Sequence, residues 1–221
     1  MKRKKMKVYG SILSCDTLRI NDEIEKVKKM GVHGLHLDVM DGVFVEKIGF
    51  SEDTVNRISR EHPDLLIECH LMVEDPLRVL RNIETQRLHR VIIHQAERFL
   101  EVSAYVQEHG ECRVGVAVES GDELLKVPAG VISRVEKVLV MGVRPGRGGQ
   151  RMRESLRRDV EVALRRCPRA VVGVDGGVNE STLAQVEGAH EVVMGSCLFE
   201  PHGERNVVAA QKRHPSREQR E

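Results

Sequence analysis

Short runs of apolar, mostly β-branched residues recur along the chain, and polar segments separate them. Eight of these runs predict β-strands, at residues 8–13, 34–40, 66–72, 90–94, 113–118, 137–143, 170–175 and 191–196. Charged stretches with helical periodicity lie between them, at residues 21–30, 51–62, 99–108, 151–165 and 180–186. Strands that alternate with helices predict a parallel sheet, and eight such units favour a closed (β/α)8 barrel over an open sheet.

The chain shows no internal boundary that would divide it into two domains. Its 221 residues leave one large or two small domains open, but no Pro-, Gly- or Ser-rich linker and no shift in composition interrupts the alternation. We therefore expect one α/β domain, a single TIM barrel over residues 1–213, followed by a polar tail over residues 214–221.

The composition argues against several classes of function. Thirty-five Lys and Arg against 34 Asp and Glu leave a formal net charge of +1, so no strong field attracts nucleic acid or an anionic membrane. Two Tyr, four Phe and no Trp offer few platforms for base stacking. No stretch approaches the roughly 18 apolar residues of a membrane span, and the five scattered Cys form no C-x-x-C motif. We expect a cytoplasmic protein with no nucleic-acid or membrane partner.

Two of the predicted strands carry polar side chains on the face that should point into the barrel. In residues 34–40, Leu35, Leu37 and Val39 alternate with His36, Asp38 and Met40. In residues 66–72, the alternate positions Glu68, His70 and Met72 share one face. A buried carboxylate without a partner is costly, so these residues need a compensating interaction.

A metal ion is one such compensation. The carboxyl ends of all strands of a (β/α)8 barrel meet at one mouth, which His36, Asp38, His70 and Asp175 would all reach. Two imidazoles and two carboxylates suit Zn, Fe, Co or Mn, and the absence of thiolates leaves that choice open. Any one of these residues alone is better read as a paired core His or a capping Asp, but four at equivalent strand ends favour a metal site.

The order of the strands also suggests a reaction. The second and seventh strands are separated around the ring by the first and eighth, so Asp38 and Asp175 could face each other across a substrate. Two carboxylates on opposite sides of one carbon are what a two-base epimerisation needs, because one removes a proton and the other returns it. A metal between them would act as a Lewis acid on the carbonyl oxygen.

Small-residue turns follow the last three predicted strands. Late loops of such barrels bind phosphate through backbone N–H groups, and these turns contain no P-loop or dinucleotide motif. The residues concerned are Gly146, Gly148 and Gly149 around Arg147, then Gly176 and Gly177, and finally Gly195 and Ser196.

Six segments resemble, in chain order, the motifs of the ribulose-phosphate 3-epimerase family: residues 11–16, 36–42, 70–72, 145–150, 174–177 and 195–196. The resemblance implies a ribulose-phosphate-binding (β/α)8 barrel that interconverts D-ribulose 5-phosphate and D-xylulose 5-phosphate in the pentose phosphate pathway. It implies one divalent metal per chain on His36, Asp38, His70 and Asp175, with Asp38 and Asp175 as the acid–base pair. It also implies a homo-oligomer, most simply a dimer.

The same resemblance implies further site residues. Ser11 and His70 would contact the substrate, and the turn residues named above, Arg147 included, would hold its phosphate. Met40, Met72 and Met141 match the family's methionines near the metal, although Met is also a common core filler. His94, at the end of the fourth predicted strand, matches a family His to which we assign no role.

The chain departs from the family pattern at several loop positions, none of them a metal ligand. These departures affect the expected loop closure and substrate preference, since a charged Arg147 replaces an aromatic residue. The positions are Gly10, Val43, Glu46, Lys47, Gly142, Arg144 and Arg147.

Two alternative functions stay open at this point. A 3-epimerase for a related phosphoketose, such as D-allulose 6-phosphate, would share the ligands and the mechanism. A catalytically lapsed barrel that binds a phosphosugar is the alternative from another class. A decarboxylase or aldolase of related barrels is disfavoured, because the Asp-x-Lys pair of those sites is absent.

Overall fold

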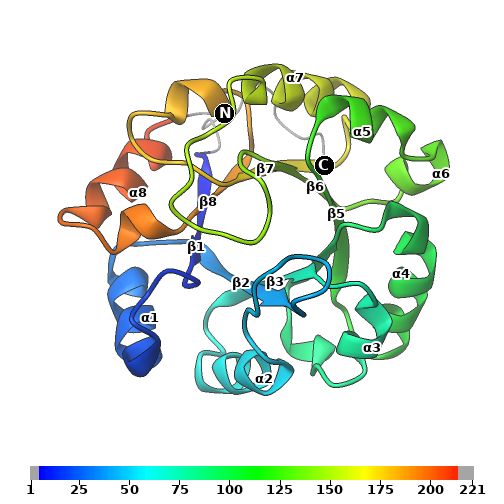
Figure 1. The fold of residues 1–221 in the computed structure, drawn as a ribbon, viewed down its shortest axis with the longest axis horizontal. Helices are drawn as coiled ribbons and strands as arrows, with labels where there is room; N and C mark the ends of the chain where they lie inside the picture. Colours follow the sequence, from blue (N-terminus) through cyan, green and yellow to red (C-terminus); the bar gives the residue numbers. More distant parts are fainter. Residues whose placement is uncertain (1–4, 214–221) are drawn as a thin grey trace.

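The computed structural model describes residues 5–213 as a closed barrel of parallel strands in sequential order. The strands are β1 (Lys7–Ser11), β2 (Gly34–Met40), β3 (Leu66–Met72), β4 (Arg90–Ile93), β5 (Arg113–Val118), β6 (Lys137–Met141), β7 (Val171–Asp175) and β8 (Glu191–Met194). β8 closes the ring by pairing with β1, where Val8 lies opposite Val192. The predicted (β/α)8 barrel is confirmed (Figure 1). The proposed tail at 214–221 lies outside the described residues.

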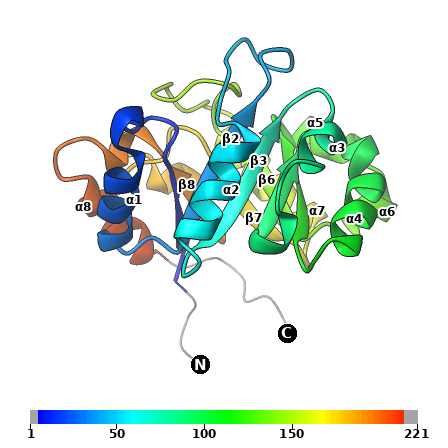
Figure 2. The same cartoon turned by 90° about the horizontal axis from the view of Figure 1, so that it is seen from below.

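Helices surround the strand ring on its outer side (Figures 1 and 2). They are α1 (Ile20–Lys29), α2 (Glu52–Glu61), α3 (Pro76–Leu80), α4 (Phe99–Glu108), α5 (Gly121–Lys126), α6 (Ala129–Ile132), α7 (Leu156–Arg166) and α8 (Gly203–Gln211). Side chains cap the N-termini of two of these helices. Ser51 caps α2 by accepting from the Thr54 N–H, and Asp75 caps α3 ahead of Pro76. No helix among residues 5–213 is long and apolar enough to cross a membrane.

The helix predicted over residues 180–186 is wrong. Only Leu183–Val186 is helical there, as a single 3-10 turn. Asn179 and Thr182 explain the difference: the Thr182 hydroxyl accepts from the Asn179 N–H at 2.9 Å, and the Asn179 side chain accepts from the Ser181 N–H at 3.0 Å. Such local side-chain bonds hold the backbone in turns and compete with an α-helix.

The strands are buried on both faces, as the alternation in the second strand predicts. Leu35, Leu37 and Val39 belong to the large apolar core that includes residues of the surrounding helices. The second, smaller apolar cluster comprises Tyr9, Ile92, Ala117, Leu139, Met141 and Val193. His36, Asp38 and His70 are also buried, on the other side of their strands from the large core.

Four charged side chains are fully or almost fully buried within the barrel, and we call them the charged layer: Glu68, Arg90, Lys137 and Glu191. Lys137 Nζ lies 2.8 Å from a Glu68 oxygen and 3.0 Å from Glu191 Oε2. Arg90 Nη1 lies 2.5 Å from Glu68 Oε2 and 3.0 Å from Glu191 Oε2. Each carboxylate therefore contacts both cations, which compensates the desolvation of all four charges.

Removal of one cation from the charged layer should destabilise the fold. We expect Lys137→Met to lower the free energy of unfolding by about 3–5 kcal/mol, because it leaves two buried carboxylates with one cation. Urea denaturation measures this loss. Arg113→Met is the control. The exposed Arg113 side chain pairs with Glu136 at 3.2 Å, and this pair should contribute less than about 1 kcal/mol to the free energy of unfolding. Equal losses in the two variants would contradict the role of the charged layer.

Candidate metal-binding active site

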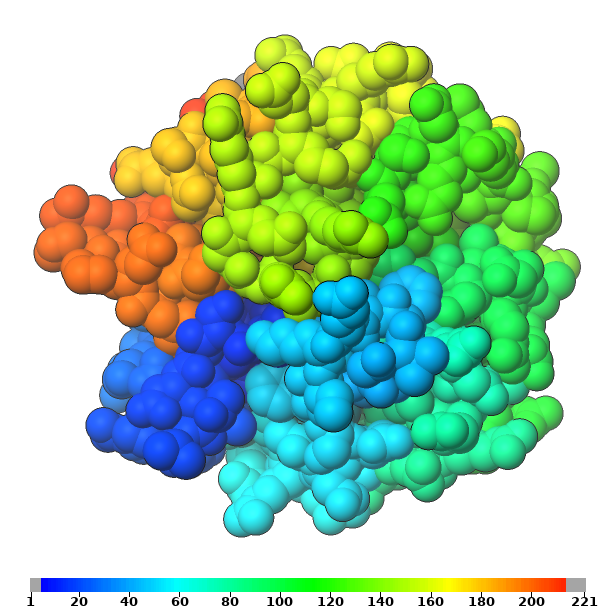
Figure 3. Space-filling model, viewed as in Figure 1, coloured from blue at the N-terminus to red at the C-terminus, as the bar shows by residue number. Residues whose placement is uncertain are grey.

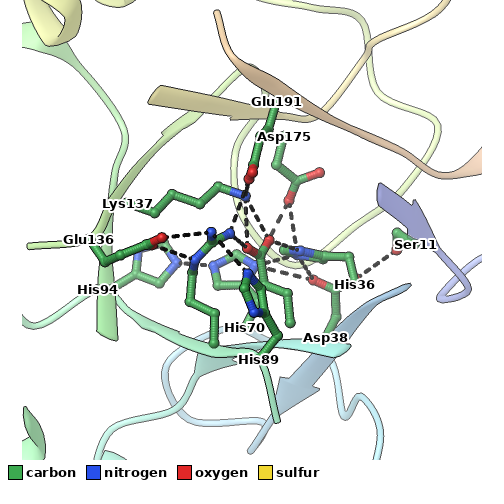
Figure 4. Close-up of polar contacts among 12 residues, drawn as sticks. Ser11, His36, Asp38, His70, His89, His94, Glu136, Lys137, Asp175 and Glu191 are labelled. Atoms are coloured by element: carbon green, nitrogen blue, oxygen red, sulfur yellow. Dashed lines mark hydrogen bonds and ion pairs between the residues drawn. The ribbon is translucent and has the colours of Figure 1, made fainter. Parts of the chain in front are cut away.

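Four predicted ligands from three strands converge on one point inside the barrel. β2 supplies His36 and Asp38, β3 supplies His70, and Asp175 is the last residue of β7. One ligand atom from each residue can be chosen so that all four lie within 4.8 Å of one another. Figure 4 shows the four side chains pointing toward a common centre. The structure therefore brings together residues that are up to 139 positions apart, from His36 to Asp175.

The spacing of these atoms fits a tetrahedral metal ion. Ligand bonds of about 2.0–2.1 Å at tetrahedral angles place neighbouring ligand atoms about 3.3 Å apart. His36 Nε2 lies 3.2 Å from His70 Nδ1, 3.3 Å from Asp38 Oδ1 and 3.7 Å from Asp175 Oδ2. His70 Nδ1 lies 3.2 Å from Asp38 Oδ1 and 3.8 Å from Asp175 Oδ2. A divalent ion can thus be bound with little movement of the side chains.

Neighbouring side chains orient two of the ligands. His36 Nδ1 lies 2.8 Å from Glu68 Oε1, so this nitrogen donates its hydrogen to the charged layer and Nε2 faces the other ligands. The Ser11 hydroxyl donates to Asp38 Oδ2 at 2.8 Å and leaves Oδ1 for the cluster. The pattern of the sequence placed Glu68 on the inner face of its strand, but it did not show which ligand Glu68 contacts.

The four candidate ligands perturb one another electrostatically. Burial favours the neutral form of His36, yet Asp38, Glu68 and Asp175 outweigh it and raise the pKa of His36 to about 10. Burial alone would raise the pKa of Asp38, but His36 and His70 hold that pKa below its usual range. The pKa of Asp175 is raised by burial and by the nearby Asp38 carboxylate. Without a metal, the pKa values of the Asp38 and Asp175 carboxyl groups therefore shift in opposite directions.

A cavity of about 680 Å³ opens above this cluster. Its lining brings together nearly all of the predicted site residues: Ser11, Asp38, Met40, Met72, Met141, Gly146, Arg147, Gly148, Gly149, Asp175, Gly176, Gly177, Gly195 and Ser196. His36 and His70 do not line it, because both are fully buried. The Asp175 side chain is 17% exposed, so this ligand is more open than Asp38 at 6%.

The turn after β7 requires its two glycines. Gly176 and Gly177 have φ values of 104° and 72°, which side chains with a Cβ rarely adopt. Steric contacts also require glycine here, because a Cβ on Gly176 would lie 2.4 Å from the Val143 side chain. Gly176 and Gly177 therefore line the cavity directly after the candidate ligand Asp175.

Two loops meet over the mouth of the barrel, the β2–α2 loop and the β6–α7 loop. Figure 3 shows them side by side, in light blue and yellow-green. Glu46 and Arg147, both departures from the family pattern, lie 3.5 Å apart between Oε2 and Nη2, and their side chains are 92% and 72% exposed. The sequence did not show that these two departures are partners.

Gly142, another departure from the family pattern, has a steric explanation. A Cβ on Gly142 would lie 2.3 Å from the backbone oxygen of Gly176. A residue with a Cβ does not fit the present path of the two turns, so the approach of Gly142 to Gly176 requires glycine.

A (β/α)8 barrel with a buried His/Asp cluster under its mouth is the class of protein that the fold and the site define. A model of the ribulose-phosphate 3 epimerase family matches residues 7–199. The ribulose-phosphate 3-epimerase of Encephalitozoon cuniculi is 34% identical over 196 residues, covering 88% of either chain. The rice ribulose-phosphate 3-epimerase named as a cytoplasmic isoform is 29% identical over 211 residues, covering 92% of either chain. The chain belongs to the ribulose-phosphate 3-epimerase family.

Solved structures agree on the fold. The tryptophan synthase alpha chain from Legionella pneumophila superimposes with a TM-score of 0.65 at 12% identity, covering 95% of this chain and 91% of that chain. At this identity the likeness concerns the barrel alone.

Metal binding should be strongly pH-dependent. A proton on His36 must leave before Nε2 can bind a cation, and the pKa of His36 is about 10 in the metal-free protein. The apparent affinity for Zn²⁺ should therefore rise about tenfold per pH unit between about pH 6.5 and about pH 8.5. Calorimetry in buffers of different ionisation enthalpy would also detect the released proton. A Zn²⁺ affinity that does not change over this range would contradict the raised pKa.

Proposed function

We propose that this chain is a metal-dependent 3-epimerase that interconverts D-ribulose 5-phosphate and D-xylulose 5-phosphate by proton transfer at C3. The observation that carries the proposal is the convergence of Asp38 and Asp175 on one cluster at the floor of a cavity. β1 and β8 separate β2 from β7 in the ring, so the two carboxylates approach the cavity from different walls.

Asp38 and Asp175 would perform the proton transfers. One carboxylate removes the C3 proton, which leaves a planar enediolate, and the other returns a proton to the opposite face. The opposed pKa shifts of the two groups support this division, because the Asp38 carboxylate stays ionised and Asp175 more readily carries a proton. Ser11 holds the Asp38 carboxylate by a hydrogen bond and also lines the cavity.

The proposed metal ligands are His36, Asp38, His70 and Asp175, whose spacing fits a tetrahedral ion. When bound, a divalent ion supplies Lewis-acid stabilisation of negative charge on the substrate oxygens. Zn, Fe, Co and Mn are all compatible with two nitrogens and two oxygens. Met40, Met72 and Met141 line the adjacent wall and would exclude water from the reacting carbon.

The glycine turns would bind the phosphate of the substrate. Gly146, Gly148, Gly149, Gly176, Gly177, Gly195 and Ser196 border one side of the cavity, and backbone N–H groups of late loops in such barrels bind phosphate. Arg147 faces Glu46 in the structure, which favours a place for it at the rim. A cytoplasmic location and a homodimer remain predictions, the first supported by the name of the rice relative.

Two measurements test the proposed function together. Elemental analysis of the purified protein should give about one transition-metal ion per chain. A coupled assay with five- and six-carbon ketose phosphates should show the highest kcat/KM with D-ribulose 5-phosphate. A preference for a hexulose phosphate would change the assigned substrate but not the assigned mechanism. Substrate binding without turnover would indicate a catalytically lapsed barrel.

The two carboxylates can be tested separately. Asp38→Asn and Asp175→Asn should each lower kcat by about a hundredfold to ten-thousandfold, because an amide cannot act as a base. Incorporation of solvent deuterium at C3 should persist at most for the epimer whose proton faces the surviving Asp. Mass spectrometry of each epimer in deuterated water measures this difference, and normal turnover by either variant would refute the two-base scheme.

The position of Arg147 at the rim can be tested by comparing variants of Arg147 and of its partner Glu46. The exposed Arg147–Glu46 pair should contribute at most about 0.4 kcal/mol, which corresponds to about twofold, so Arg147→Phe should change KM by less than about twofold. Glu46→Gln should have an equally small effect. Steady-state kinetics at low and high ionic strength check both variants. A several-fold rise in KM for Arg147→Phe alone, shrinking at high salt, would instead show a direct contact with the phosphate.

A further inference from the structure

His70 contacts a third histidine that is not among the proposed ligands. His94 follows directly after β4, and its Nε2 lies 2.9 Å from Nε2 of His70. The ring centroids are 5.0 Å apart and the ring planes differ by 23°, so the two rings meet nearly edge to edge through these nitrogens. Figure 4 shows His94 on the side of His70 that faces away from Asp175. His94 is 9% exposed and does not line the cavity, so it is not placed to contact a substrate.

A contact between two ring nitrogens contains one hydrogen, which belongs to one ring or the other. If His70 carries it on Nε2, then a neutral His70 has a lone pair on Nδ1, the atom that lies 3.2 Å from both Asp38 Oδ1 and His36 Nε2. If His94 carries it, the hydrogen of a neutral His70 sits on Nδ1 instead. In that second arrangement, a hydrogen occupies the position from which His70 would bind a metal.

His36 and His70 present different nitrogens to the same point. His36 donates from Nδ1 to the anionic Glu68 and faces the cluster through Nε2. His70 faces the cluster through Nδ1 and has an imidazole, not a carboxylate, at its far nitrogen. Each ligand histidine therefore has its own partner on the side away from the cluster, which is the usual arrangement around a bound metal.

We propose that His94 is a positioning residue: its Nε2 accepts the Nε2–H of His70 and so holds His70 in the tautomer whose Nδ1 lone pair faces His36 and Asp38. This inference rests on the metal site of the proposed function. It assigns a role to a residue that the reaction itself does not use.

The surroundings of His94 support this assignment. The Phe44 ring, from the β2–α2 loop, packs against the His94 ring with centroids 4.9 Å apart. Phe44 and His70 both contact the His94 ring, and His94 is almost fully buried, so little water reaches the contact between the two histidines. A hydrogen bond that is shielded in this way is stronger than one exposed to solvent.

The first test reads the tautomer directly and needs no substitution. Long-range ¹H–¹⁵N correlation spectra of the metal-free protein distinguish the two ring nitrogens of His70. The proposal expects the hydrogen on Nε2 of His70 and a bare Nε2 on His94. A hydrogen on Nδ1 of neutral His70 would overturn it.

The second test uses three variants and Zn²⁺ alone as the probe. His94→Leu removes the acceptor and should weaken Zn²⁺ binding by about tenfold to a hundredfold. His94→Gln keeps an acceptor oxygen and should restore binding to within about threefold of the parent. His62→Leu is the matched control, because His62 is also buried but bonds to Asn21, away from the cluster, and should bind Zn²⁺ like the parent.

The outcomes separate a positioning role from a space-filling one. Equal weakening in His94→Gln and His94→Leu, or no weakening in His94→Leu, would overturn the proposal. If the parent binds no Zn²⁺, the metal site of the proposed function fails, while the spectrum of the metal-free protein still decides the tautomer of His70.

Discussion

Hydrogen bonds to the buried Glu68 carboxylate link β3 to three other strands inside the barrel. Glu68 is fully buried and accepts from Lys137, Arg90 and His36, which belong to three other strands. A buried charge is stable only if its partners are fixed, so these bonds constrain the position of β2, β4 and β6 relative to β3. One of the partners is a proposed metal ligand, so the same carboxylate both neutralises the charged layer and orients the site.

The polarity of the interior changes in steps from this layer toward the mouth. Cations and anions balance in the charged layer, the buried imidazoles of His36 and His70 lie next to it, and the carboxylates Asp38 and Asp175 border the cavity. Glycine turns and the exposed pair of Glu46 and Arg147 come last. Groups that need a defined geometry are thus the most buried, whereas five of the seven departures from the family pattern are exposed: Val43, Glu46, Lys47, Arg144 and Arg147.

The sequence predicted the barrel and the convergence of four candidate ligands because both depend on local signals. Alternation in residues 34–40 and 66–72 identified the inner faces, and the position at strand ends brought His36, Asp38, His70 and Asp175 to one mouth. The 3-10 turn at Leu183–Val186 was missed because its side-chain bonds compete with a helical pattern. The contacts of Arg147 with Glu46 and of His94 with His70 join segments 101 and 24 residues apart, and no local pattern specifies them.

The charged layer also has a consequence for how the chain folds. Arg90 and Glu191 are 101 residues apart, and Glu68 and Lys137 are 69 apart, so every partner is present only after β8 has been made. Contacts of such long range slow folding because a large loop must close before they form. A half-barrel that ends before β6 would contain Glu68 and Arg90 but neither Lys137 nor Glu191. The charged layer therefore acquires its last carboxylate with the strand that closes the ring, which favours folding of the barrel as one unit.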